Sequence, residues 1–138
     1  MYTPHNLRTG AGAYARLGVE TQAMSASPHQ LICMLFDGAV TAIGMARHHI
    51  AEGDVAAKGQ AISKAVGIVA NGLKASLDAK AGGAAGAELV ANLSALYDYV
   101  VRRLLQANLR DDLGALDEAR SLLESIGSAW REMEGGER

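Results

Sequence analysis

The chain has a single cysteine, Cys33, among its 138 residues. One thiol cannot close a disulfide within the chain, and this usage suits a reducing compartment. The first ten residues also lack the apolar segment of a secretory signal. The apolar run that starts at Leu31 is shorter than the roughly twenty residues that cross a bilayer, and it contains Asp37. These absences predict a cytoplasmic protein without membrane insertion.

The chain also lacks a large excess of positive or of negative charge. Thirteen lysines and arginines oppose fifteen aspartates and glutamates, which gives a formal net charge of -2 at pH 7. Nucleic-acid-binding domains usually carry a basic patch or a basic excess. We therefore expect no nucleic-acid partner.

Residues that metal binding and catalysis need are scarce as well. No glutamate stands three positions before any of the four histidines, so the Glu-x-x-His pairs of di-iron bundles are absent. His48 and His49 are adjacent, about 100° apart on a helix, and cannot clamp one ion as an i, i+4 pair does. We expect no enzyme activity, no cofactor and no metal site. A phosphotransfer bundle needs one exposed histidine, so these two residues keep that less favoured alternative open.

What the chain does contain is a series of helix signals. Ser27 is a predicted N-cap, with Pro28 at the first helical position and Gln30 three residues after the cap. Gly53 is expected to end this helix and Asp54 to cap the next one. Apolar residues at three- and four-residue steps predict helices over residues 28–52, 55–79, 87–107 and 112–133.

Four long helices with short connections and no strand signal predict an all-α fold, an antiparallel four-helix bundle over residues 27–134. Residues 1–26 hold few large apolar side chains and are predicted to form a flexible or short-helical N-terminal arm. Residues 135–138 form a tail. Asn108 is expected to provide a left-handed C-cap for the third helix, and Asp111 or Asp112 to open the last helix.

Two of the predicted helices carry more apolar surface than one core face requires. In the first helix, a second apolar stripe lies beside a stripe that is already sufficient for the core, and the third helix repeats this pattern. A second apolar stripe must be shielded from water. Either another part of the protein's own bundle, a second copy of the chain, or an amphipathic client bound in a groove can shield it. The predicted client-binding residues on these stripes are Leu31, Met34, Ala42, Met45, Tyr97 and Val101.

Several motifs follow one another at a recognisable spacing. They are Ser27-Pro28, Leu31-Ile32, Met34-Leu35-Phe36-Asp37-Gly38-Ala39, Lys64-Ala65 with Ile68, Leu96-Tyr97-Asp98-Tyr99, Ala107-Asn108 and Trp130. Their order and spacing resemble the flagellin-specific export chaperone family, FliS, over roughly residues 14–133.

The resemblance implies an antiparallel helical bundle in the cytoplasm that binds the disordered carboxyl-terminal segment of flagellin. Such a chaperone prevents premature polymerisation of flagellin and helps to deliver it to the flagellar export apparatus, where export-gate components are further partners. No catalytic residues come with the resemblance. It also implies that a monomer binds one client, and that the arm around Tyr14 lies over the client groove as a lid.

Two features depart from the family pattern. Phe36 stands where the family commonly has tyrosine, so a hydroxyl contact is lost while the ring can still pack. A few extra residues follow Gly82-Gly83 before Asn92-Leu93, which alters the loop between the two middle helices. The main alternative function is a self-assembling structural bundle, in which the second stripes pair with another copy.

Overall fold

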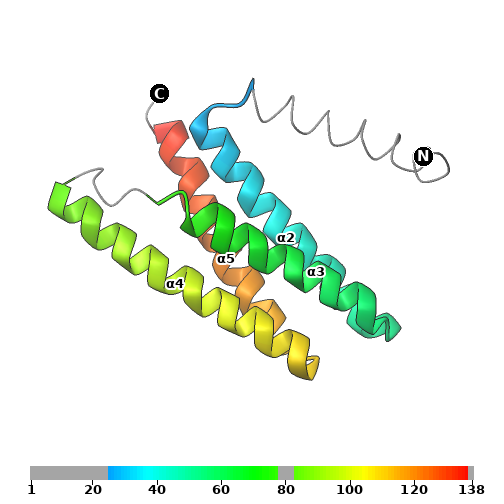
Figure 1. Ribbon diagram of the computed structural model, residues 1–138. Coiled ribbons are helices and arrows are strands. Elements are labelled where there is room, and N and C mark those ends of the chain that lie inside the picture. Colours follow the sequence, from blue (N-terminus) through cyan, green and yellow to red (C-terminus); the bar gives the residue numbers. More distant parts are fainter. Residues whose placement is uncertain (1–24, 78–82, 137–138) are drawn as a thin grey trace, which may run out of the picture. The chain divides into compact units, whose positions relative to one another are not determined.

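The computed structural model describes residues 25–77 and 83–136, with side chains described through Met133. The chain divides into two compact units, Met1–Leu31 and Ile32–Arg138. The described helices are α2 (Pro28–Glu52), α3 (Val55–Gly67), the π-helix η1 (Ile68–Lys74), α4 (Gly83–Arg110) and α5 (Leu113–Gly136). Across the described ranges no strand occurs, and the prediction of an all-α four-helix bundle is confirmed (Figure 1).

Helix α2 begins and ends where its sequence signals place it. In the first unit, the Ser27 amide donates to Oε1 of Gln30 at 2.9 Å, and the Gln30 amide donates to Oγ of Ser27 at 3.1 Å. These reciprocal bonds form a capping box. At the other end Gly53 has a φ of 71°, and Asp54 accepts a hydrogen bond from the Ala57 amide at 3.0 Å and so caps α3.

The remaining helix boundaries differ from the expected ones in places. The helix expected from residue 55 onward changes at Ile68 into the π-helix η1, whose hydrogen-bonding pattern has no signature in apolar spacing. Helix α4 begins at Gly83 and continues to Arg110, so the prediction of a left-handed cap at Asn108 is wrong. Asp111 takes that conformation instead, with a φ of 52°.

A bonded cluster secures the turn between α4 and α5. The Nζ of Lys58, on α3, donates to the carbonyl oxygen of Asn108 at 3.0 Å and to Oδ1 of Asp111 at 2.6 Å. Asp112 then caps α5 by accepting from the Ala115 amide at 3.0 Å. Because the lysine is only 7% exposed, this ion pair is partly shielded from water and ties α3 to the turn.

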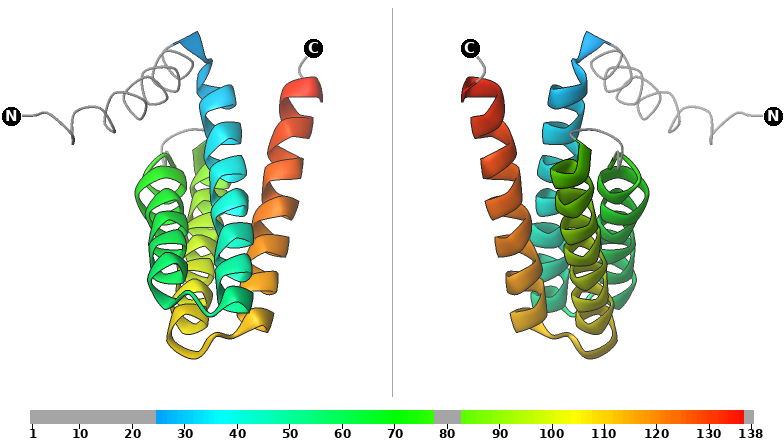
Figure 2. Two further views of the ribbon diagram at one scale, coloured as in Figure 1. Left: turned by 90° about the vertical axis from the view of Figure 1, so that its right-hand side faces the viewer. Right: turned by 90° about the vertical axis from the view of Figure 1, so that its left-hand side faces the viewer.

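In the unit from Ile32 onward, the four long helices pack around one core. Helix α2 lies between α3 and α5, and α4 lies across the bundle from it (Figure 2). The largest fully buried side chains are Ile43, Ile62, Leu73, Leu104, Leu116, Leu123, Val69 and Val100. They come from α2, α3, η1, α4 and α5, so every described helix contributes to this core.

Two glycines allow α2 to approach its neighbours closely. A Cβ atom added at Gly127 of α5 would lie 3.1 Å from Cγ and 3.2 Å from Cβ of Phe36. One added at Gly72 of η1 would lie 3.0 Å from a methyl carbon of Leu35. The two α2 side chains therefore pack directly on helix backbone, a contact that any larger residue at these positions would obstruct.

Gly127→Ala is expected to destabilise the protein by about 1 to 3 kcal/mol, because the added methyl group overpacks against the buried Phe36. Gly67→Ala is the matched control. Its backbone is right-handed helical and no atom lies within 4 Å of an added Cβ, so alanine should stabilise by up to about 1 kcal/mol. Urea unfolding measures both effects, and equal changes in the two variants would contradict the close approach.

Candidate binding surface

Among the hollows between residues that the structure describes, three differ in chemistry. The first, here called the apolar groove, has a volume of about 280 Å³ and lies among α2, the turn after η1, α4 and α5. None of its described lining residues is charged. Its lining residues are Ile32, Phe36, Ser76, Leu77, Gly86, Leu89, Val90, Leu93, Tyr97, Ile126 and Trp130.

Tyr97 places a polar group in this apolar setting. The residue is 3% exposed, and its ring centroid lies 6.5 Å from that of Phe36. Burial raises the pKa of Tyr97 to about 12. No hydrogen bond joins its hydroxyl to a residue in the described ranges, and this oxygen is not among the fully buried polar atoms that lack a partner. It is therefore accessible from the groove, where a ligand with a backbone or side-chain acceptor can bond it.

Alkaline pH should destabilise the fold through Tyr97. The pKa is raised in the folded state above its ordinary 10.0, so this contribution to stability is complete below pH 10 and is lost as the pH rises toward about 12. Tyr97→Phe cannot ionise, so its stability relative to the unchanged protein should increase across this window. Guanidinium unfolding at several pH values measures the difference, and a constant difference from pH 9 to 12 would contradict the burial effect.

The second hollow, the α2–α3 groove, has a volume of about 170 Å³. Alanines form much of its surface, and Met45, which is 50% exposed, stands beside them. Methionine is flexible and polarizable, so it adapts to differently shaped apolar partners. The residues that line this groove are Ala42, Met45 and His49 of α2 and Ala57, Gln60, Ala61 and Lys64 of α3.

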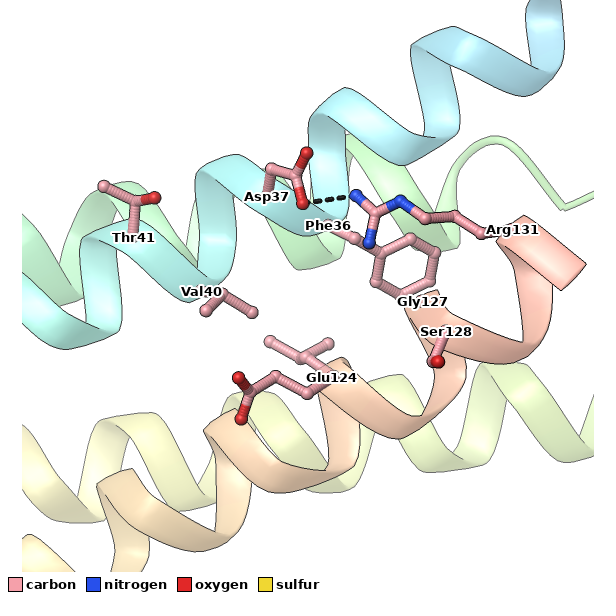
Figure 3. Close-up of a pocket in the computed structure, with 9 residues that line it drawn as sticks. Phe36, Asp37, Val40, Thr41, Glu124, Gly127, Ser128 and Arg131 are labelled. Atoms are coloured by element: carbon pink, nitrogen blue, oxygen red, sulfur yellow. Dashed lines mark hydrogen bonds and ion pairs between the residues drawn. The ribbon is translucent and has the colours of Figure 1, made fainter.

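The third hollow, the α2–α5 cleft, has a volume of about 390 Å³ and mixed chemistry. An ion pair between Asp37 of α2 and Arg131 of α5 spans it, with Phe36 beside the pair (Figure 3). A second ion pair, between Arg47 and Asp117 at 3.0 Å, joins the same two helices further along. Asp37, which interrupts the apolar run of the sequence, therefore serves the pairing of α2 with α5.

The structure groups some of the residues predicted for client binding and separates others. Ala42 and Met45 line the α2–α3 groove together, whereas Tyr97 lines the apolar groove. Met34 and Val101 are partly buried and line none of these three hollows.

Leu31, predicted to bind the client, and Tyr14, predicted to act as a lid, are not among the described residues of the Ile32–Arg138 unit. Leu31 is 36% exposed and belongs to the first unit. Tyr14, the lid candidate, lies outside the described residues.

Two of the residues predicted for the second apolar stripes are buried, not exposed. Ala42 is 2% exposed and Tyr97 is 3% exposed, so both belong mainly to the core. On α2, Ile68 of η1 covers part of this stripe, since a Cβ added at Gly38 would lie 3.3 Å from the Ile68 side chain. Among the predicted residues of the Ile32–Arg138 unit, Met45 is the one that stays widely exposed.

Sequence reasoning missed most of the apolar groove. Leu89 and Leu93 line the groove although they are absent from the predicted client-binding residues, and Leu89 is 56% exposed. Trp130, which is partly buried, also lines the groove. Spacing identifies the apolar face of each helix, whereas the position of the groove depends on how α2, α4 and α5 pack together in the fold.

Over residues 25–77 and 83–136, no cluster of three or more histidine, cysteine, aspartate or glutamate side chains has a geometry that could hold an ion. His48, which the phosphotransfer alternative requires, lies 3.8 Å from a carboxylate oxygen of Glu52. The hollows therefore offer apolar contact, hydrogen bonds and isolated charges.

The chain is similar to known proteins along nearly its whole length. The profile of the family described as "Flagellar protein FliS" matches residues 10–137. The Flagellar secretion chaperone FliS of Salmonella typhimurium is 54% identical over 133 residues, covering 96% of this chain and 93% of that protein. The protein of the same name from Escherichia coli is 47% identical, covering 89% of this chain and 88% of its own length.

A more distant relative carries the same name. The Flagellar secretion chaperone FliS of Bacillus subtilis is 32% identical over 126 residues, covering 91% of this chain and 86% of that protein. A secretion chaperone has a non-enzymatic role, which agrees with the lack of a catalytic constellation in the sequence. The chain belongs to the FliS family of flagellar secretion chaperones.

Proposed function

We propose that this protein binds the disordered carboxyl-terminal segment of flagellin in the cytoplasm, prevents its premature polymerisation and aids its delivery to the flagellar export apparatus. The names of the relatives support a role in flagellar secretion. The observation that carries the finer proposal is the apolar groove, which exposes Leu89 and is lined by aromatic and aliphatic side chains.

The groove suits a segment that becomes ordered when it binds. An amphipathic client inserts its apolar side chains into such a groove and thereby offsets the entropy lost on ordering. The α2–α3 groove adds a second anchoring point through Met45. Two separate anchoring points favour a long client segment that follows the bundle surface, because each one alone buries little area.

A cytoplasmic location is part of this proposal. Helix α2 is long and apolar enough to cross a membrane by composition alone, with a mean hydropathy of 1.3. Its side chains Phe36, Ala39, Ile43 and Ala46, however, are buried in the bundle. A helix with one face buried in a core is typical of a water-soluble bundle.

Light scattering with and without the segment tests the proposal against self-assembly. A chaperone should be a monomer that forms a one-to-one complex with the carboxyl-terminal flagellin peptide, and the mass should rise by one peptide. A tight dimer whose mass does not respond to the peptide would instead support the self-assembling bundle. The lid role of Tyr14 stays a prediction, which deletion of residues 1–20 tests through a modest gain in peptide affinity.

A further inference from the structure

Almost every cation in the described part of the bundle has a partner. Ion pairs with carboxylates engage six of them, and Arg102 lies over the ring of Tyr99 at 5.8 Å from its centroid. Arg110 lies in the last turn of α4, where a cation is favourable to the helix dipole. The six paired cations are Arg47, Lys58, Lys74, Arg103, Arg120 and Arg131.

Lys64 differs from the seven cations that contact a carboxylate or a ring, and unlike Arg110 it is not at the end of a helical segment. It is exposed, and within the described ranges no carboxylate, ring or hydrogen-bond acceptor pairs with it. The residue does not lie at a free helix end, because η1 continues directly from α3. Its ammonium group is therefore not accounted for by contacts within the bundle.

Lys64 lies at the edge of the α2–α3 groove. It lines this groove together with Ala42, Met45 and Ala61, and none of the described residues that line it is acidic. The groove measures about 170 Å³, and a cavity of about 150 Å³ already accommodates a benzene-sized group. One aliphatic or aromatic side chain of a partner can enter, with Lys64 at its edge.

The other two hollows lack this combination. The apolar groove has no charged side chain among its described lining residues. The α2–α5 cleft already pairs its cation, Arg131, with Asp37. Charge complementarity therefore assigns a carboxylate to the α2–α3 groove in particular.

We infer that the α2–α3 groove selects a client segment with an apolar side chain next to an aspartate or glutamate. This inference rests on the proposed function. The apolar side chain packs on the alanines and Met45, and the carboxylate pairs with Lys64. Because opposite charges at an interface fix register and suppress wrong partners more than they add affinity, Lys64 is a specificity determinant of the chaperone.

The test is a calorimetric titration of the cognate carboxyl-terminal flagellin peptide with variants at Lys64. Lys64→Gln should weaken binding about three- to tenfold, and Lys64→Glu by more than tenfold, since the latter introduces repulsion. Arg110→Glu is the matched control for net charge, because Arg110 does not line the groove. It should leave the affinity within about twofold of the unchanged protein.

Peptide variants identify the partner carboxylate. Each acidic residue of the peptide is replaced in turn by its amide, and one replacement should cost as much affinity as Lys64→Gln and add nothing to it in the double variant. A lysine at that peptide position should restore binding to Lys64→Glu. Equal affinity of the Lys64 variants and the unchanged protein overturns the inference while leaving the proposed function intact. No binding by the unchanged protein overturns the proposed function itself.

Discussion

Lysine in place of Met45 should weaken binding of the flagellin segment at least about tenfold, or about 1.4 kcal/mol. Met45 is 50% exposed and lines the α2–α3 groove, so its thioether is available to a client. An ammonium group there takes the place of the apolar contact and must lose water when the client's apolar side chain docks, which is costly because Lys64 already engages the client carboxylate. The free protein should keep its helical content and unfolding midpoint, because the new charge is solvated before binding.

Met133→Lys provides the matched control. This methionine is 54% exposed and lines none of the three hollows, so the substitution makes the same chemical change outside the grooves. Calorimetric titration should give an affinity close to that of the unchanged protein. If Met45→Lys unfolds the bundle, or if both variants bind equally well, Met45 is not a client contact.

Leu104→Ala should lower the free energy of unfolding by about 2 to 5 kcal/mol. Leu104 has no exposed surface and is among the largest fully buried side chains of the core. Truncation leaves a cavity where α4 faces the other helices, and the neighbouring side chains relax only partly. Such a loss is a large fraction of the roughly 5 to 15 kcal/mol that stabilises a small domain, so the melting temperature should fall steeply.

The next residue along the chain supplies the control. Leu105 is 52% exposed, and Leu105→Ala should change stability by no more than about 0.5 kcal/mol, as surface substitutions usually do. Urea unfolding of both variants measures the contrast. Similar losses at the two positions would mean that the assigned face of α4 is incorrect.

The helix ends of the bundle could be predicted where short-range chemistry decides them. Ser27 and Gln30 bond each other's backbone as a capping box, and Gly53 and Asp54 end one helix and cap the next. These interactions join residues a few positions apart, so a single sequence contains all the necessary information.

Features set by distant contacts could not be predicted in this way. The left-handed residue after α4 is Asp111, not Asn108, and its carboxylate bonds Lys58, which lies 53 positions earlier. The π-helix η1 packs Gly72 against Leu35 of another helix. Local propensity does not contain these contacts, and tertiary packing overrides it.

The same limit applies to the candidate site. Apolar periodicity correctly indicated that α2 and α4 carry wide apolar surfaces, but it could not say which parts α3, η1 and α5 would cover. Ala42 and Tyr97 are nearly buried, whereas Met45 and Leu89 stay exposed beside hollows. The sequence also cannot show which cations are paired, because the carboxylates that contact the other described cations are in several cases far away along the chain.

The central claim, that this bundle captures the carboxyl-terminal segment of flagellin in its grooves, is tested most directly by calorimetric titration at several temperatures. The account predicts saturable one-to-one binding with a negative heat-capacity change, the sign of apolar burial. It also predicts that a flagellin lacking its carboxyl-terminal segment gives no such heat. Equal binding of the truncated flagellin, or the absence of saturable binding by the segment, would contradict it.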